Sequence, residues 1–105
     1  RRGWLLHGTP RGAVHVDEGA AAALLKGKSL LPRGVTRVEG SFDFGDVVRV
    51  HGPSGPVAQG LSNYSAADVE RIRGLATHEI EGALGTKDFD EVVHRNQLVL
   101  LQPQE

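Results

Sequence analysis

The sequence GKS at Gly27, Lys28 and Ser29 is the ending of a phosphate-binding P-loop motif. In a P-loop, backbone N–H groups between a strand and the following helix wrap the phosphates, and the lysine bridges the outer ones. Here Ala22 stands where the motif requires its first glycine, and a helix-forming run precedes Gly27 instead of following it. We therefore interpret GKS as the end of a helix followed by a loop, and not as a nucleotide site.

A group of basic residues surrounds this loop. Between positions 26 and 37 no acidic residue occurs. The basic residues of this stretch are Lys26, Lys28, Arg33 and Arg37. Such a patch can contact RNA phosphates without reading the base sequence. It can equally be an ordinary solvated loop, because a protein surface must carry charge. We call residues 26–37 the basic segment, and both interpretations stay open here.

Metal binding and acid–base catalysis find little support in the residue pattern. His78 opens the sequence HEIEG, but Gly82 stands where the zinc motif H-E-x-x-H needs its second histidine. The remaining histidines are expected on the surface or hydrogen-bonded in strands; they are His7, His15, His51 and His94. Closely spaced acids such as Asp88 and Asp90 are expected to be solvated. The sequence predicts no metal, cofactor or catalytic residue in this chain.

The elements that position the basic segment are short. Alternating residues predict a strand over 12–16, and Asp17 is a good N-cap for a helix that Gly27 ends. β-branched residues then indicate strands at 35–42 and 47–51. The first helix therefore lies between two predicted strands, and the basic segment connects it to the second.

A hairpin is predicted next, with residues 57–64 returning along the preceding strand. Within it, Gly60 indicates a bulge or a close backbone approach. At its end, Tyr64 can stack on a base or pack over the end of the sheet, and we favour packing.

Two short helices and two short strands complete the predicted elements. Ser65 and Asp68 have capping-box spacing and open a helix that Gly74 ends. Thr77 is expected to cap a second helix, which Gly85 ends. The last strands are predicted at 91–94 and 97–101. Short strands interrupted by single helices favour a small mixed barrel, mainly β with flanking helices.

Composition is consistent with one domain. The chain has 105 residues, 39% of them hydrophobic, and no apolar run long enough to span a membrane. It has no cysteine, which excludes disulfides and fits a cytoplasmic protein. Residues 1–60 carry a net charge of +3 and residues 61–105 carry −4, which gives −1 in total. Because the chain starts with arginine and contains no methionine, we expect a piece of a longer protein.

Four stretches of the sequence together resemble a PUA domain. They are VDEGA, LLKGKSLLPRGV, GSFDFGDVV and VAQGLSNYS, and they span residues 16 to 65. PUA domains recur in pseudouridine synthases, archaeosine transglycosylases and related proteins. The resemblance implies a PUA-like mixed-sheet pseudo-barrel.

The second half of the chain is similar to the C-terminal end of the bacterial glutamate 5-kinase family, which carries a PUA domain after its catalytic domain. The matching stretches are LSNYSAADVERIRG, THEIEGALG and DEVVHRNQLVLL. This resemblance implies a linker from an upstream kinase domain at 1–11, a PUA domain with a family-specific C-terminal extension at 12–101, and a polar tail at 102–105.

The resemblance also implies a parent enzyme that phosphorylates the side-chain carboxylate of glutamate with ATP and Mg²⁺, at the start of proline biosynthesis. In that family, ATP, glutamate and the inhibitor proline bind the amino-acid-kinase domain. No residue of this chain corresponds to that domain. The implied partners are the upstream kinase domain and further copies in a homo-oligomer, with RNA as a further possibility and no membrane.

In RNA-modifying PUA proteins the first helix, the loop after it and neighbouring strand edges face the RNA. By resemblance, the candidate contacts to RNA or to a protein partner are Lys26, Gly27, Lys28, Ser29, Arg33, Asn63 and Tyr64. Three functions therefore remain open: a regulatory module that contacts the kinase, an RNA-binding module that uses the basic segment, and a structural oligomerisation module.

Overall fold

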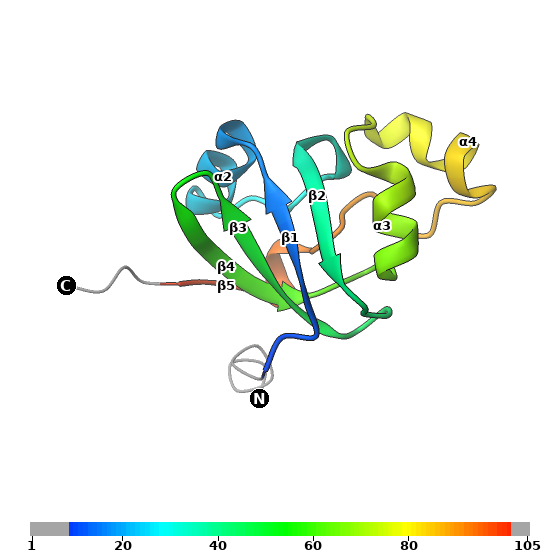
Figure 1. The fold of residues 1–105 in the computed structure, drawn as a ribbon. Coiled ribbons are helices and arrows are strands. Elements are labelled where there is room, and N and C mark those ends of the chain that lie inside the picture. Colours follow the sequence, from blue (N-terminus) through cyan, green and yellow to red (C-terminus); the bar gives the residue numbers. More distant parts are fainter. Residues whose placement is uncertain (1–8, 102–105) are drawn as a thin grey trace.

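The computed structural model describes residues 9–101, and a five-stranded mixed sheet is its centre (Figure 1). The strand order is β2-β1-β3-β4-β5. β1 and β3 are parallel, and the other neighbouring strands are antiparallel. The strands are β1 (Gly12–Val16), β2 (Val35–Gly40), β3 (Val47–Gly52), β4 (Gly55–Leu61) and β5 (Leu98–Leu100). This arrangement confirms the predicted mixed sheet with flanking helices.

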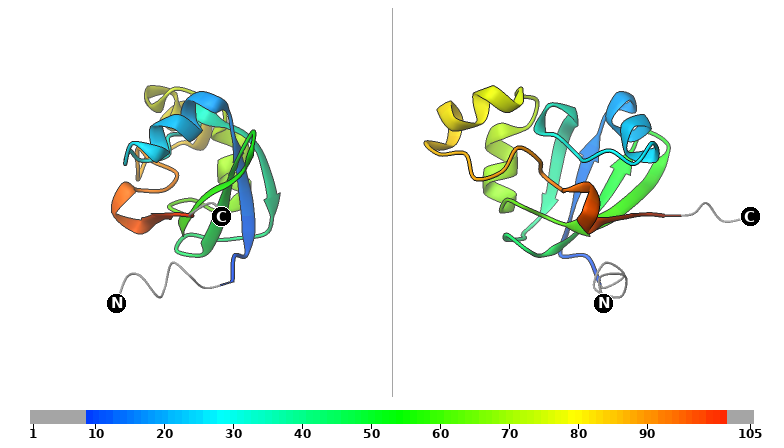
Figure 2. Two further views of the ribbon diagram at one scale, coloured as in Figure 1. Left: turned by 90° about the vertical axis from the view of Figure 1, so that its left-hand side faces the viewer. Right: turned by 180° about the vertical axis from the view of Figure 1, so that it is seen from behind.

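Three short helices lie on one side of β1 and β3, and the opposite side of these strands carries no helix formed by residues 9–101 (Figure 2). They are α2 (Glu18–Leu25), α3 (Ala66–Ile72) and α4 (Ile80–Leu84), with 3-10 turns at Pro32–Gly34, Thr77–Glu79 and Arg95–Gln97. α2 packs on β3 and β4, whereas α3 packs on β2 and α4. The inner face of the sheet is therefore covered by helices from two parts of the chain.

The core fills the space between the sheet and these helices. Alternation along the strands aims Val14, Val48 and Val50 inward, and all three are fully buried. From the other side come Leu24, Leu30, Val69, Ile72, Ile80, Val92 and Val93, each at most 1% exposed. The residues that follow α4 thus contribute to the same core as the first strand.

The residues after α4 cross between the basic segment and the end of β4. The N–H of Leu30 donates to the carbonyl of Val93 (2.9 Å), and the N–H of Val92 donates to the carbonyl of Leu30 (2.7 Å). On the other side, the N–H of Asn63 donates to the carbonyl of Val92 (2.8 Å). We call residues 85–101 the C-terminal extension.

Several predicted boundaries were wrong. Residues 91–94 do not form a strand, because only Val93 makes a bridge, to Leu30, while the buried side chains of Val92 and Val93 fill the core. The hairpin partner of β3 ends at Leu61, and β2 ends at Gly40. The proposed linker at 1–11 lies within the described residues only from residue 9, and the tail at 102–105 lies outside them.

The cap of the last helical segment also differs from the prediction. Thr77 is the first residue of a 3-10 turn and does not cap it. The N–H of Ala76 instead donates to Oε1 of Glu79 (2.8 Å). The Ser65 cap was predicted correctly, since its Oγ accepts from the N–H of Asp68 (3.2 Å).

Candidate interface at the basic segment

The GKS sequence is the end of α2. Gly27 has φ of +86°, a left-handed conformation that favours glycine, directly after the C-cap Lys26. The N–H of Gly27 donates to the carbonyl of Leu24 (2.9 Å), and the N–H of Lys28 donates to the carbonyl of Ala23 (3.1 Å). These N–H groups close the helix, so they cannot cradle a phosphate. The geometry does not fit a nucleotide site.

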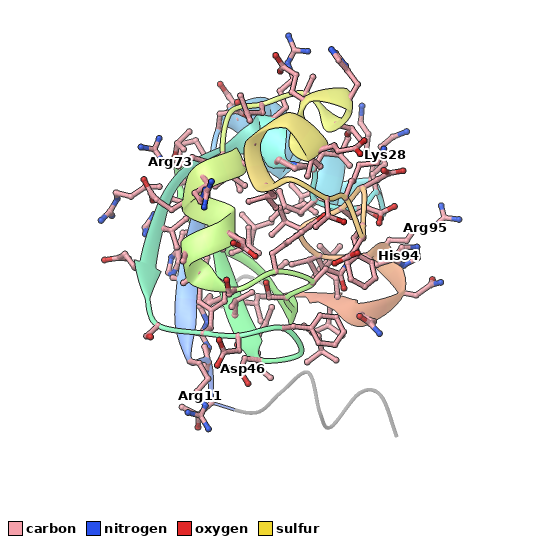
Figure 3. The ribbon with its side chains drawn as sticks, turned by 90° about the vertical axis from the view of Figure 1, so that its right-hand side faces the viewer. Arg11, Lys28, Asp46, Arg73, His94 and Arg95 are labelled. Atoms are coloured by element: carbon pink, nitrogen blue, oxygen red, sulfur yellow. The ribbon has the colours of Figure 1, made fainter. Side chains whose placement is uncertain are left out.

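Ser29 and Leu30 fix the loop against the C-terminal extension. Oγ of Ser29 accepts a hydrogen bond from the backbone N–H of Arg95 (2.8 Å), and Leu30 pairs with Val93 as described above. Arg95 and Lys28 therefore lie on the same side of the molecule, and both side chains point outward (Figure 3). Sequence reasoning missed Arg95, because only the fold brings position 95 next to position 29.

The other half of the loop packs on α2 through a glycine. A Cβ at Gly34 would lie 2.4 Å from Cβ of Ala20, so only glycine permits this approach. Between α2 and this loop is a cleft of about 280 Å³, with Asp17, Ser29 and Arg33 in its lining. Gly34 therefore serves close packing, whereas Gly27 serves the bend.

The basic segment presents charge together with apolar surface. Lys26, Lys28 and Arg33 are exposed, and none of them forms an ion pair within residues 9–101. Leu25 and Leu31 beside them are 62% and 44% exposed. Cations attract an anionic partner, but exposed leucines gain free energy only from apolar contact. The surface suits a partner that offers both negative charge and apolar side chains.

Arg37 belongs to the basic segment by sequence and to the sheet by structure. It lies on β2, where Nη1 is 3.4 Å from Oε2 of Glu39. Next to it, Nε2 of His15 is 2.6 Å from Oε1 of Glu39 and 3.2 Å from Nη2 of Arg37. This one nitrogen can donate to Glu39 or accept from Arg37, but not both at once. Arg37 is therefore engaged on the sheet, whereas Lys26, Lys28 and Arg33 form no ion pair with any residue that the structure describes.

A pair of histidines on the outer face of the sheet was also missed from the sequence. The rings of His15 and His51 stack with centroids 5.0 Å apart, because β1 and β3 are parallel neighbours. Burial, and then the neighbouring His15, lower the pKa of His51. The hydrogen bond to His15, and then the charge of Arg37, lower the pKa of Glu39. Parallel pairing between distant strands has no short-range sequence pattern that would reveal it.

Asn63 and Tyr64, which follow β4, are buried. They are 8% and 5% exposed. Nδ2 of Asn63 donates to the carbonyl of Glu91 (3.1 Å). The hydroxyl of Tyr64 donates to the carbonyl of Phe89 and accepts from its N–H (3.1 Å), and the two rings meet edge to face. The structure thus uses both side chains to hold the C-terminal extension, and Tyr64 has no exposed ring face for a base.

Two further properties bear on the class of protein. Among the described residues, no group of three or more His, Asp or Glu side chains could hold a metal ion. No helix in residues 9–101 has the length and apolar character needed to cross a membrane.

The comparison with protein families agrees with the fold. The PUA domain model matches residues 12–84, and the chain belongs to the PUA domain family. Among solved structures, a PUA domain from Aeropyrum pernix in complex with tartrate superimposes with a TM-score of 0.61 at 34% identity. That match covers 81% of this chain and 41% of the other.

Curated relatives extend the match beyond residue 84. The chain is 54% identical over 93 residues to the glutamate 5-kinase of Caldanaerobacter subterraneus subsp. tengcongensis, covering 87% of this chain and 25% of the relative. It is 51% identical over 105 residues to that of Anaeromyxobacter dehalogenans, covering 97% and 28%. The chain thus spans about a quarter of these relatives, and matches their C-terminal part.

Proposed function

We propose that this chain is the regulatory PUA module of a glutamate 5-kinase, without catalytic residues of its own. One observation carries the proposal: the similarity to glutamate 5-kinases includes the C-terminal extension, which lies beyond the residues that match the PUA model. A module that shared only the PUA fold would have no reason to be similar to these kinases in this extension as well.

The parent enzyme then transfers the γ-phosphoryl group of ATP to the side-chain carboxylate of L-glutamate, giving L-glutamyl 5-phosphate and ADP in the first step of proline biosynthesis in the cytoplasm. ATP, Mg²⁺, glutamate and proline bind the kinase region. Within this chain, the N–H groups of Gly27 and Lys28 are used by α2, so the GKS sequence does not provide a P-loop. Its effect on the kinase operates through contacts with the kinase region and with other subunits.

Mixed charge and scattered apolar side chains on the surface support such contacts, since interfaces between domains of one chain are moderately polar. The test is to compare the parent enzyme with a form that lacks residues 12–101. We expect a changed KM for glutamate or a changed concentration of proline for half-inhibition, measured by ADP release. If kinetics, proline inhibition and subunit assembly are all the same in both forms, the regulatory role is wrong.

RNA binding is the second candidate, and it is favoured by the three cations of the basic segment that form no ion pair within residues 9–101. If it is correct, a labelled hairpin RNA binds the chain at low salt, and the affinity falls as salt rises. The double change Lys28→Ala with Arg33→Ala should then weaken binding by roughly tenfold or more. Lys87→Ala is the matched control, because Lys87 already pairs with Asp90 (3.1 Å) away from the loop. Absence of saturable binding at low salt would exclude this candidate.

A further inference from the structure

A second surface combines an exposed aromatic side chain with acidic residues. Phe44 is 65% exposed in the turn between β2 and β3, and its ring stacks on that of Phe89 with centroids 5.7 Å apart. Beside the stacked rings is a cleft of about 400 Å³, lined by Asp43, Asp68 and Asp88 with a single guanidinium, Arg71. We call it the acidic cleft.

The turn holds Phe44 in its exposed position. The N–H of Asp43 donates to Oδ2 of Asp46 (2.9 Å), and the N–H of Gly45 donates to the carbonyl of Ser62 (2.7 Å). Tyr64 fixes the backbone of Phe89 through the two hydrogen bonds already described. An aromatic side chain that is held in water on a rigid frame is typical of an interaction surface.

The acidic cleft combines residues from both parts of the chain. Asp43, Phe44 and Asp68 lie within the stretch that matches the PUA model, whereas Asp88 and Phe89 lie in the C-terminal extension. The extension is shared with the glutamate 5-kinases. The cleft is therefore complete only in chains that carry this extension, and its partner should be found in the same proteins.

The complementary surface is present on this chain. The basic segment carries three free cations beside the exposed Leu25 and Leu31, whereas the acidic cleft carries three carboxylates, without ion pairs in residues 9–101, beside an exposed ring. Lys28 and Asp46, which shares the turn of Phe44, lie toward opposite ends of the molecule (Figure 3). The turn at Asp46 thus lies apart from Lys28 on one copy, whereas a second copy can present its basic segment to the acidic cleft.

We propose that the basic segment of one copy docks into the acidic cleft of a second copy. The exposed Leu25 and Leu31 cover Phe44, and the cations of the basic segment lie opposite Asp68 and Asp88. The contact joins two different surfaces, so it is heterologous and can continue from copy to copy. Each surface is small, so two isolated chains bind each other weakly. In an assembled parent enzyme the modules are held near one another, and this high effective concentration strengthens the same contact.

RNA fits the combined observations less well than a second copy does. Phosphates would be repelled by the carboxylates of the cleft, and the exposed leucines would gain nothing from them. The proposed contact would be one of the contacts between subunits through which the module acts on the kinase. Its role in regulation therefore rests on the proposed function. Its test needs no kinase region, so the two proposals can fail separately.

The chain contains no cysteine, which allows a direct test with the full 105-residue chain. A Lys28→Cys chain is mixed with a Thr86→Cys chain under mild oxidation, since Thr86 lines the acidic cleft. We expect a disulfide-linked heterodimer that exceeds either homodimer by about tenfold, because the contact raises the local thiol concentration. In the control, a Ser54→Cys chain replaces the Thr86→Cys chain; Ser54 is exposed in the turn between β3 and β4. This pair should form the disulfide-linked heterodimer only at the yield expected from random collisions. Equal yields with Thr86→Cys and Ser54→Cys would overturn the proposal.

Charge reversal supplies a second measurement. By sedimentation velocity at low salt, Arg33→Glu or Asp88→Lys alone should weaken self-association by about tenfold. In a mixture of the two variants, the Asp88→Lys chain still has its native basic segment and the Arg33→Glu chain still has its native acidic cleft. These two surfaces can dock as in the wild type, so mixed dimers should still form. If neither change affects the association, or if the mixture is as weak as each variant, the docking is wrong. RNA binding by the Lys28 face without self-association would likewise reject it.

Discussion

Tyr64 shows how one side chain joins the PUA stretch to the C-terminal extension. Its position after a predicted strand indicated that it packs over the end of the sheet, which the structure confirms. The sequence could not show its partner, because the two hydrogen bonds to Phe89 span 25 positions. Local patterns also identified Gly27 and Ser65, whose roles depend on neighbours within a few residues. They could not identify the stacking of His15 on His51 or of Phe44 on Phe89, which depends on the fold.

Changing Tyr64→Phe should lower the free energy of unfolding by about 1–3 kcal/mol, because the N–H and carbonyl of Phe89 lose their partner. Urea unfolding followed by circular dichroism measures this change. An unchanged midpoint would mean that these groups find water or another partner.

Tyr64 should also make the free energy of unfolding depend on pH in the alkaline range. Burial raises the pKa of Tyr64 above its ordinary value. The folded chain therefore holds this proton more tightly than the unfolded chain, so the contribution is fully present below about pH 10 and is lost as the pH rises through the folded pKa. The stability difference between wild type and Tyr64→Phe should shrink over that interval. Because the chain has one tyrosine, the absorbance of the phenolate reports the titration directly.

At the scale of elements, β5 lies so close to β4 that one position admits only glycine. A Cβ at Gly60 would lie 2.5 Å from the carbonyl oxygen of Gln97 and 2.8 Å from Cγ1 of Val93. The sequence predicted a bulge or a close approach at Gly60, and the close approach is confirmed. It did not predict that residues 91–94 lie outside the sheet, because Val92 and Val93 have the β-branched composition of a strand. In the structure their backbone groups are hydrogen-bonded to Leu30 and Asn63 instead.

Gly60→Ala should destabilise the chain by roughly 1–3 kcal/mol, because the crowding atom is backbone and cannot rotate away. Gly82→Ala is the matched control: it lies within α4 with no atom within 4 Å of the added Cβ. It should leave stability unchanged or raise it by up to about 1 kcal/mol. Thermal unfolding of both variants gives the comparison. Equal changes in stability for Gly60→Ala and Gly82→Ala would contradict the close packing of β5 on β4.

For the whole molecule, the first strand and the C-terminal extension share one core. Val14, Val50, Val92 and Val93 are all fully buried in it. The mixed sheet, one domain and the family resemblance were predicted from the sequence, because strand and helix patterns are local and the motifs are specific. The two surfaces were only half predicted: the basic segment is continuous in sequence, whereas the acidic cleft is assembled from three separate stretches.

Hydrogen exchange of the native chain tests this shared core. The amides of Leu30, Asn63 and Val92 should exchange at rates within about tenfold of those of β1 and β3 after correction for intrinsic rates, because opening them requires global unfolding. Much faster exchange at Leu30 and Val92, with β1 still protected, would show that the extension opens as a separate unit.

The bridge between Leu30 and Val93 also has a consequence for the order of folding. These residues are far apart in the sequence, and contacts of such separation form slowly because a long loop must close first. During synthesis, residues 9–84 leave the ribosome before Val92 and Val93 are available to cover Leu30 and fill the core. We infer that the nascent module remains open to proteases until Val92 and Val93 have been made, so the C-terminal extension protects the residues that precede it.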